Sequence, residues 1–144
     1  MIKFSKSIFI LSPPEKVFDV IDDTANLPAI WRNLTNIRNL KRIPNGGHSF
    51  QFDYRMAGVR IEGSSVDLEF VRPARIVTHT TGGVNSTLAW TFKPGADGVG
   101  TDLTLEIRYE VPMPLVGKLA EVIISKINET DITYVLNYLK LKCQ

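Results

Sequence analysis

The sequence predicts an α+β protein: a curved antiparallel sheet of about six to seven strands, two short helices after the first strand, and a long C-terminal helix. Two patterns indicate this class. Residues 34–111 show an apolar period of two, interrupted by glycine- and proline-rich turns. Residues 116–141 instead place apolar side chains three or four apart, as one face of a helix does. The chain of 144 residues has the length of one domain, so residues 1–144 are expected to fold as a single unit.

The N-terminal segment predicts a strand and two short helices. In KFSKSIFIL, residues 3–11, apolar side chains alternate with lysine and serine, which is typical of a strand. Residues 12–15, SPPE, have the pattern of a helix start, with a serine cap, prolines in the first turn and a glutamate three residues on. A second short helix is expected near Asn26, with LPAIW at residues 27–31.

The central region predicts strands joined by hairpin turns at PNGG (44–47), RPAR (72–75), TGG (81–83) and PGADGVG (94–100). Residues 50–56 and 102–111 alternate apolar with polar side chains, so the sheet should have one dry and one wet face. In residues 59–70 the parity of the apolar side chains flips near Gly63-Ser64-Ser65, which predicts a β-bulge there.

The C-terminal helix contains a stripe with a carboxylate in its middle. Its members are Val116, Ala120, Ile123, Ile127, Asp131, Tyr134, Tyr138 and Leu141. A carboxylate is costly to bury unless it is paired or hydrated. We expect Asp131 to point between helix and sheet and to meet a donor from Tyr54, Tyr109, Arg32, His79 or water. The alternative, a solvated Asp131 on a locally exposed turn, stays open.

Ile132, Leu136 and Leu139 lie opposite that stripe on the helical wheel. They make the second half of the helix apolar on more than one side. Either the two short helices or a second subunit should cover them, so a monomer and a homodimer both remain open.

The composition indicates which partners, metals and cofactors are not expected. The 17 basic and 15 acidic residues are spread along the chain, and the most basic segment, IRNLKRI at 37–43, is short, so no nucleic-acid partner is expected. Cys143 is the single cysteine, and no histidine pair has metal-ligand spacing, so we expect no metal site and no cofactor. The first ten residues do not resemble a signal peptide and no apolar run reaches membrane-spanning length, which predicts a cytoplasmic location without stable membrane insertion.

Few side chains indicate chemistry. His48 follows a turn and is expected to be exposed, while the face that His79 takes is undetermined. Asp53, Arg55, Arg60 and Glu62 are expected to form charge pairs on the wet face. No nucleophile elbow or phosphate-binding loop is present.

The order of elements, with SPPEKVF, LPAIW, EFVRPARIVTHTTGG, TLAWTFKP and TDLTLEIRYEVP, resembles the polyketide cyclase/dehydrase branch of the START-like (SRPBCC) superfamily. It is similar, more distantly, to coenzyme Q-binding proteins and to the birch-pollen allergen and plant hormone-receptor group. The resemblance covers nearly the whole chain. It implies a helix-grip fold, in which the sheet wraps the long helix and leaves a cavity. No catalytic set matches residue by residue, so no reaction is implied.

The expected cavity carries the functional hypotheses. Its predicted ligand-binding residues are Trp31, Tyr54, Trp90, Ile107, Tyr109, Ile123, Ile127, Asp131 and Tyr134. The preferred hypothesis is a carrier or sensor of a hydrophobic small molecule, of lipid, polyketide, isoprenoid or quinone type. A cyclase or dehydratase using Asp131 and the tyrosines as acid–base groups is the alternative, and a protein-interaction domain is the third. Trp31 can serve packing alone, and Arg32 can be solvated or hold an acidic ligand group.

Overall fold

The computed structural model describes residues 2–56, 58–83, 85–110 and 118–144; within 118–127 it describes the course of the helix and only the side chains of Val122 and Lys126. The elements in chain order are β1 (Ile2–Ile10), α1 (Pro14–Asp22), the 3-10 turn η1 (Thr24–Asn26), α2 (Leu27–Ile30), β2 (Leu34–Arg42), β3 (His48–Met56), β4 (Val59–Val71), β5 (Arg75–Gly82), β6 (Asn85–Pro94), β7 (Thr101–Glu110) and α3 (Lys118–Cys143).

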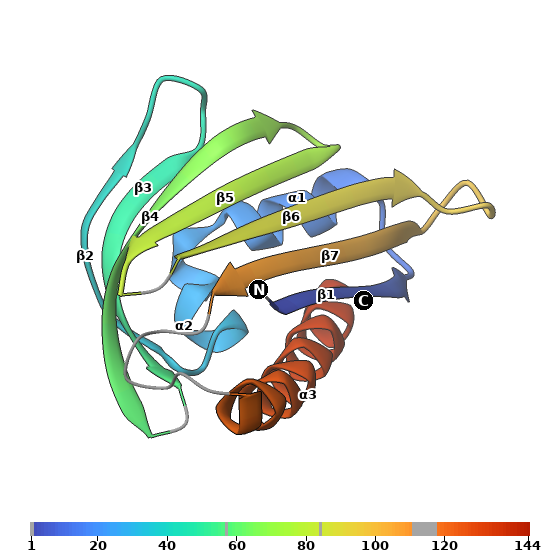
Figure 1. Ribbon diagram of the computed structural model, residues 1–144. Helices are drawn as coiled ribbons and strands as arrows, with labels where there is room; N and C mark the ends of the chain where they lie inside the picture. Colours follow the sequence, from blue (N-terminus) through green and yellow to red (C-terminus); the bar gives the residue numbers. More distant parts are fainter. Residues whose placement is uncertain (1, 57, 84, 111–117) are drawn as a thin grey trace.

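The seven strands form one antiparallel sheet in the order β1-β7-β6-β5-β4-β3-β2. The sheet is strongly curved, and the long helix α3 lies against it beside β1 (Figure 1). This is the predicted helix-grip arrangement, including the two short helices after the first strand. The period of two in the sequence appears as alternating burial, most regularly in β7.

One part of the interior is solidly packed. It lies where α1 and the second half of α3 meet β1, β6 and β7. We call it the packed half and define it by seven side chains that are each less than 2% exposed: Ile10, Val17, Phe18, Leu103, Leu105, Val135 and Leu139. The ring of Phe18 meets those of Phe70 and Phe92 at centroid distances of 5.2 and 5.1 Å. Apolar burial of this kind is the main source of the stability of the fold.

The buried face of α3 differs from the predicted stripe. Among its described side chains the buried ones are Asn128, Ile132, Val135, Leu136, Leu139 and Cys143, whereas Tyr134 is 37% and Leu141 78% exposed. The stripe was therefore misplaced by part of a turn, because this helix is apolar on more than one side. Ile132, Leu136 and Leu139 are covered within the chain, where α3 packs against β1, α1 and α2.

Ser12 does not cap α1 as predicted. The cap position belongs to Pro13, which makes no side-chain hydrogen bond. The Ser12 hydroxyl instead donates to the carbonyl of Cys143 at the end of α3, and the backbone N–H of Leu11 donates to Oε1 of Gln144 at 2.9 Å. Ser12 thus satisfies one of the carbonyls that a helix leaves unpaired at its C-terminus.

The bulge in β4 also lies elsewhere than predicted. The pairing with β3 is continuous through Gly63–Ser65, and the register shift against β5 falls between Asp67 and Glu69. Leu68 is exposed at this point, while Phe70 packs against the core. Because Leu68 is an apolar residue on the outer face, the apolar residues of this strand do not all mark its inward side.

The edge strand β2 is irregular. Asn36 and Asn39 have positive φ values of 50° and 54°, and the register against β3 shifts twice. The side chain of Asp53 is buried on the outer face beside β2. Its carboxylate oxygens lie 3.2 Å from Nδ2 of Asn36, 3.2 Å from a guanidinium nitrogen of Arg38 and 3.5 Å from one of Arg60. The hydrogen bond from Asn36 and the nearby arginines lower the pKa of Asp53. This network contains one of the charge pairs expected for the wet face, between Arg60 and Asp53.

Candidate functional site

A cavity of about 180 Å³ lies between the concave face of the sheet and the helices. It is far larger than the roughly 10–15 Å³ that a single water requires on the same measure. Its apolar lining comprises Phe4, Ile21, Leu27, Ile30, Trp31, Leu34, Phe50, Phe52, Tyr54, Met56, Ile76, Leu88, Trp90, Ile107, Tyr109 and Ile132. Its polar lining comprises Asp22, Thr24, His48, Ser65, Asp67, Thr78, Thr80, Ser86, Asn128 and Asp131.

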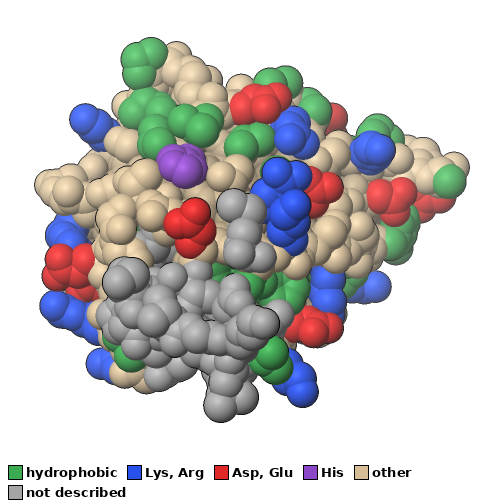
Figure 2. Space-filling view, in the orientation of Figure 1, with side chains coloured by type: hydrophobic (Ala, Val, Ile, Leu, Met, Phe, Trp, Pro, Cys, Tyr) green, Lys and Arg blue, Asp and Glu red, His purple; other side chains and the backbone are tan. Residues whose placement is uncertain are grey.

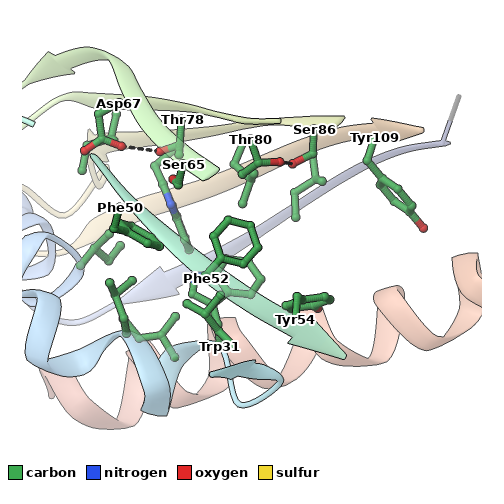
Figure 3. A pocket seen from close by; sticks show the side chains of 18 of the residues that line it. Trp31, Phe50, Phe52, Tyr54, Ser65, Asp67, Thr78, Thr80, Ser86 and Tyr109 are labelled. Atoms are coloured by element: carbon green, nitrogen blue, oxygen red, sulfur yellow. Dashed lines mark hydrogen bonds between the residues drawn. The ribbon is translucent and has the colours of Figure 1, made fainter. Parts of the chain in front are cut away.

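Small hydroxyl side chains leave this space open. Ser65, Thr80, Ser86 and Tyr109 are successive cross-strand partners on β4, β5, β6 and β7, and we call them the hydroxyl row. Figure 3 shows their side chains along the sheet side of the cavity, with Thr80 and Ser86 hydrogen-bonded to each other. Nδ2 of Asn128 on α3 donates to the Tyr109 hydroxyl, which joins the row to the helix. The row therefore gives an apolar cavity one polar edge.

Aromatic side chains from β3 and the end of α2 form another part of the wall. Trp31, Phe50, Phe52 and Tyr54 lie across the cavity from the hydroxyl row in Figure 3. Trp31 meets Trp90 edge-on, with ring centroids 6.4 Å apart and planes at 63°. A Cβ at position 63 would lie 2.8 Å from the Phe52 ring, so a glycine there makes room for this ring.

Asp131 stands at one polar end of the cavity. Its carboxylate oxygens lie 3.5 Å from a guanidinium nitrogen of Arg32 and 3.3 Å from Nδ2 of Asn33, and its side chain is 16% exposed. Arg32 was among the expected donors and Asn33 was not. Burial, and secondarily the negative charge of Asp131, raise the pKa of Tyr54 to about 12. Tyr54 therefore stays neutral at this end.

His48 stands at the other polar end, where an exposed side chain was predicted. Its side chain is only 13% exposed and lines the cavity, with Nδ1 3.5 Å from Oδ1 of Asp22 and 3.9 Å from Oδ2 of Asp67. Asp67 accepts hydrogen bonds from the Thr78 hydroxyl at 2.7 Å and from the His48 backbone N–H at 2.9 Å. His48 follows the turn as predicted, but it is already the first residue of β3 and points inward. Its shared parity with Phe50 is the sequence signal that indicates an inward position.

The predicted site residues separate into three groups. Those that line the cavity are Trp31, Tyr54, Trp90, Ile107, Tyr109 and Asp131. The side chains of Ile123 and Ile127 lie outside the described residues. Tyr134 does not line this cavity: its partly exposed ring stacks on Tyr138, and the Arg32 guanidinium lies 4.0 Å from its centroid. The misplaced helical stripe explains this error.

His79 takes the outer face of the sheet. It alternates with the cavity-lining Thr78 and Thr80, and its Nδ1 lies 3.3 Å from the Thr87 hydroxyl. It cannot act on a molecule in the cavity from that face. Within the described residues, no three histidine, cysteine, aspartate or glutamate side chains are grouped to hold a metal ion.

Among the described helices, none is long and apolar enough to cross a membrane. On the face seen in Figure 2, basic and acidic side chains are interspersed, with no single large patch of either sign.

Known structures share this architecture at low sequence identity. A START superfamily protein from Mycobacterium smegmatis aligns with a TM-score of 0.78 and 14% identity, over 98% of this chain and 96% of that one. The Zhui aromatase/cyclase from Streptomyces sp. R1128 aligns with a TM-score of 0.78 and 15% identity, over 99% and 93% of the two chains. A protein from Thermus thermophilus aligns with a TM-score of 0.76 and 19% identity, over 99% and 97%. At these identities the likeness establishes the fold.

The sequence itself assigns the family. No curated protein matches it significantly. The family described as polyketide cyclase / dehydrase and lipid transport matches residues 1–144, the whole length of the sequence. The chain therefore belongs to the polyketide cyclase/dehydrase and lipid transport family.

Proposed function

We propose that this protein binds a hydrophobic small molecule in the cavity between sheet and helices, as a carrier or sensor. The observation that carries the proposal is a space of about 180 Å³ with predominantly apolar walls and a few placed polar groups. Small-molecule sites in proteins commonly have this composition. A bound ligand would remove apolar surface from water, and this stabilises the complex by roughly 25 cal/mol for each Å² that is buried.

The hydroxyl row supports an oriented ligand. Hydroxyls can donate and accept, so Thr80 and Ser86 can exchange their mutual hydrogen bond for one to an oxygen of a bound molecule. The aromatic side chains opposite offer flat apolar surface. Together they favour a molecule with an apolar face and polar atoms along one edge.

Two measurements test the proposal. Native mass spectrometry of freshly purified protein should show an additional mass that organic extraction removes. Nile red, a neutral hydrophobic dye, should bind the emptied protein with increased fluorescence.

Leu88→Trp would fill the cavity from β6, and we expect it to weaken dye binding by about tenfold or more.

Thr87→Trp is the matched control, because Thr87 is the preceding residue of β6 and faces outward beside His79. It should leave dye binding unchanged. Equal dye affinity in Leu88→Trp and the wild type, with both folded by circular dichroism, would place dye binding outside the cavity and contradict the proposal.

A second candidate function is catalysis of a dehydration or cyclisation, and the environment of His48 favours it. An imidazole beside the carboxylates of Asp22 and Asp67, in the lining of an apolar cavity, is an arrangement suited to proton transfer. His48→Gln separates the two functions. If the protein is a dehydratase, the variant should co-purify with a molecule heavier by one water than the wild-type ligand. The same ligand in both proteins would favour binding alone.

A further inference from the structure

The ionisable groups of the cavity lining are unequal in sign. Among the described residues that line it, the ionisable side chains other than tyrosines are Asp22, His48, Asp67 and Asp131, with no lysine or arginine. Even with His48 protonated, three negative groups would face one positive group. The lining itself therefore has more acidic than basic side chains.

Two of these carboxylates have a cationic partner outside the cavity. Asp22 lies 3.1 Å from a guanidinium nitrogen of Arg42, and Asp131 lies 3.5 Å from one of Arg32. Both arginine side chains are about half exposed. Their charges compensate Asp22 and Asp131 from the solvent side, while the guanidinium groups themselves stay out of the lining.

Asp67 differs from these two. Its carboxylate accepts from two neutral donors, the Thr78 hydroxyl and the His48 backbone N–H, and the only titratable base within 4 Å among the described residues is the His48 imidazole at 3.9 Å. The Asp67 side chain is 13% exposed and borders the cavity (Figure 3). A partly buried carboxylate without a lysine or arginine partner repels an anion and attracts a cation more strongly than a solvated one does.

We propose that the cavity selects neutral or positively charged hydrophobic ligands against anionic ones, and that Asp67 is the residue that sets this preference. The proposal rests on the proposed function, since it concerns the ligand of the same cavity. An amine or hydroxyl on the ligand would lie at the end formed by Asp67, Thr78 and His48, where it can donate to the carboxylate. A free fatty acid or another hydrophobic carboxylate would bring its charge toward the Asp67 carboxylate, which no lysine or arginine compensates among the described residues.

The test compares three straight-chain molecules with the same number of carbons: dodecylamine, dodecanol and dodecanoate. Each is titrated against Nile red bound to the wild-type protein, at pH 8 and low ionic strength. We expect dodecylamine and dodecanol to displace the dye. The affinity of dodecanoate should be lower than that of dodecylamine by about tenfold or more. This comparison uses one folded protein and does not depend on any variant.

Asp67→Asn then tests the assignment to this residue. It should weaken the binding of dodecylamine and strengthen that of dodecanoate. Dodecanol binding should change far less, because the asparagine oxygen still accepts from its hydroxyl, so dodecanol also reports that the variant is folded. Asp102→Asn, which removes the same charge from the exposed outer side of β7, is the control and should change none of the three. Equal shifts in Asp67→Asn and Asp102→Asn would overturn the role of Asp67.

The failures of the two proposals are distinguishable. If dodecanoate displaces the dye as well as dodecylamine does, the cavity binds ligands but does not select by charge, and this inference is overturned. If Nile red and all three molecules fail to bind, the proposed function is overturned with it.

Discussion

The packed half of this interior shares one sheet and one helix with the part that holds the cavity, which we call the hollow half. Only the packed half is filled by side chains. On β7, Leu103 and Leu105 belong to the same buried cluster as side chains of α1 and α3 and are completely buried. One to three strands away, the inward positions of β4, β5 and β6 carry Ser65, Thr80 and Ser86. The comparison shows that the size of inward side chains decides where this fold keeps a void, because β5, β6 and β7 pair with one another without a register shift.

The largest expected difference between the halves is in the cost of losing a leucine. Leu139→Ala in the packed half should lower the free energy of unfolding by about 2–5 kcal/mol, since it leaves a new cavity among fully buried neighbours. Leu88→Ala should cost about 1 kcal/mol or less, because the Leu88 side chain already borders open space. Urea unfolding of both variants measures this. Equal losses would mean that the cavity closes in solution.

Tyr54 gives the next contrast, in its response to pH. Its pKa is raised to about 12 in the folded protein, against about 10 in the unfolded chain. The folded state then holds a proton that the unfolded state releases, so the free energy of unfolding should fall between about pH 10 and 12, by roughly 2–3 kcal/mol. Urea unfolding at pH 9 and pH 11 should show a smaller loss in Tyr54→Phe. An identical loss in both proteins would show that Tyr54 is solvated.

The smallest effect is expected on the surface of the packed half. Arg72 donates two hydrogen bonds, of 2.9 and 2.8 Å, to Asp19 of α1, and this lowers the pKa of Asp19. The pair stabilises the fold above the usual carboxyl pKa of about 4, and this contribution is lost as the pH falls through the lowered value. Both side chains are about half exposed, so Asp19→Asn should cost at most about 1 kcal/mol at pH 7. A loss of several kcal/mol would show that packing depends on this pair.

Much of the fold could be predicted from local pattern. The alternation in β3 and β7 identified their inward faces because each inward set is apolar and each outward set polar. In α3 the same logic failed, since Tyr134 and Ile132 are both compatible with an apolar face and only packing against β1, α1 and α2 selects Ile132.

The site was less predictable, because its polar edge consists of residues that only the register between neighbouring strands brings side by side. Ser65, Thr80 and Ser86 come from three strands, and each alone is an ordinary hydroxyl in a strand. Their contiguity follows from the strand pairing, which no single segment encodes. The inward position of His48 could have been predicted, since extending the alternation of Phe50 and Phe52 by one step places it inward. The inward position of Asp67 could not, because Asp67 lies beside the bulge, which was predicted at another place in the strand.

The irregular edge strand has a consequence for how molecules of this protein behave toward each other. A regular edge offers a row of unpaired backbone groups to which another chain can add a strand. In β2, the left-handed Asn36 and Asn39 and the two register shifts interrupt that row, and Arg38, Lys41 and Arg42 add positive charge along it. A second copy would meet few consecutive groups in register and a like charge. The sheet is thereby protected from growing outward through β2 into an aggregate.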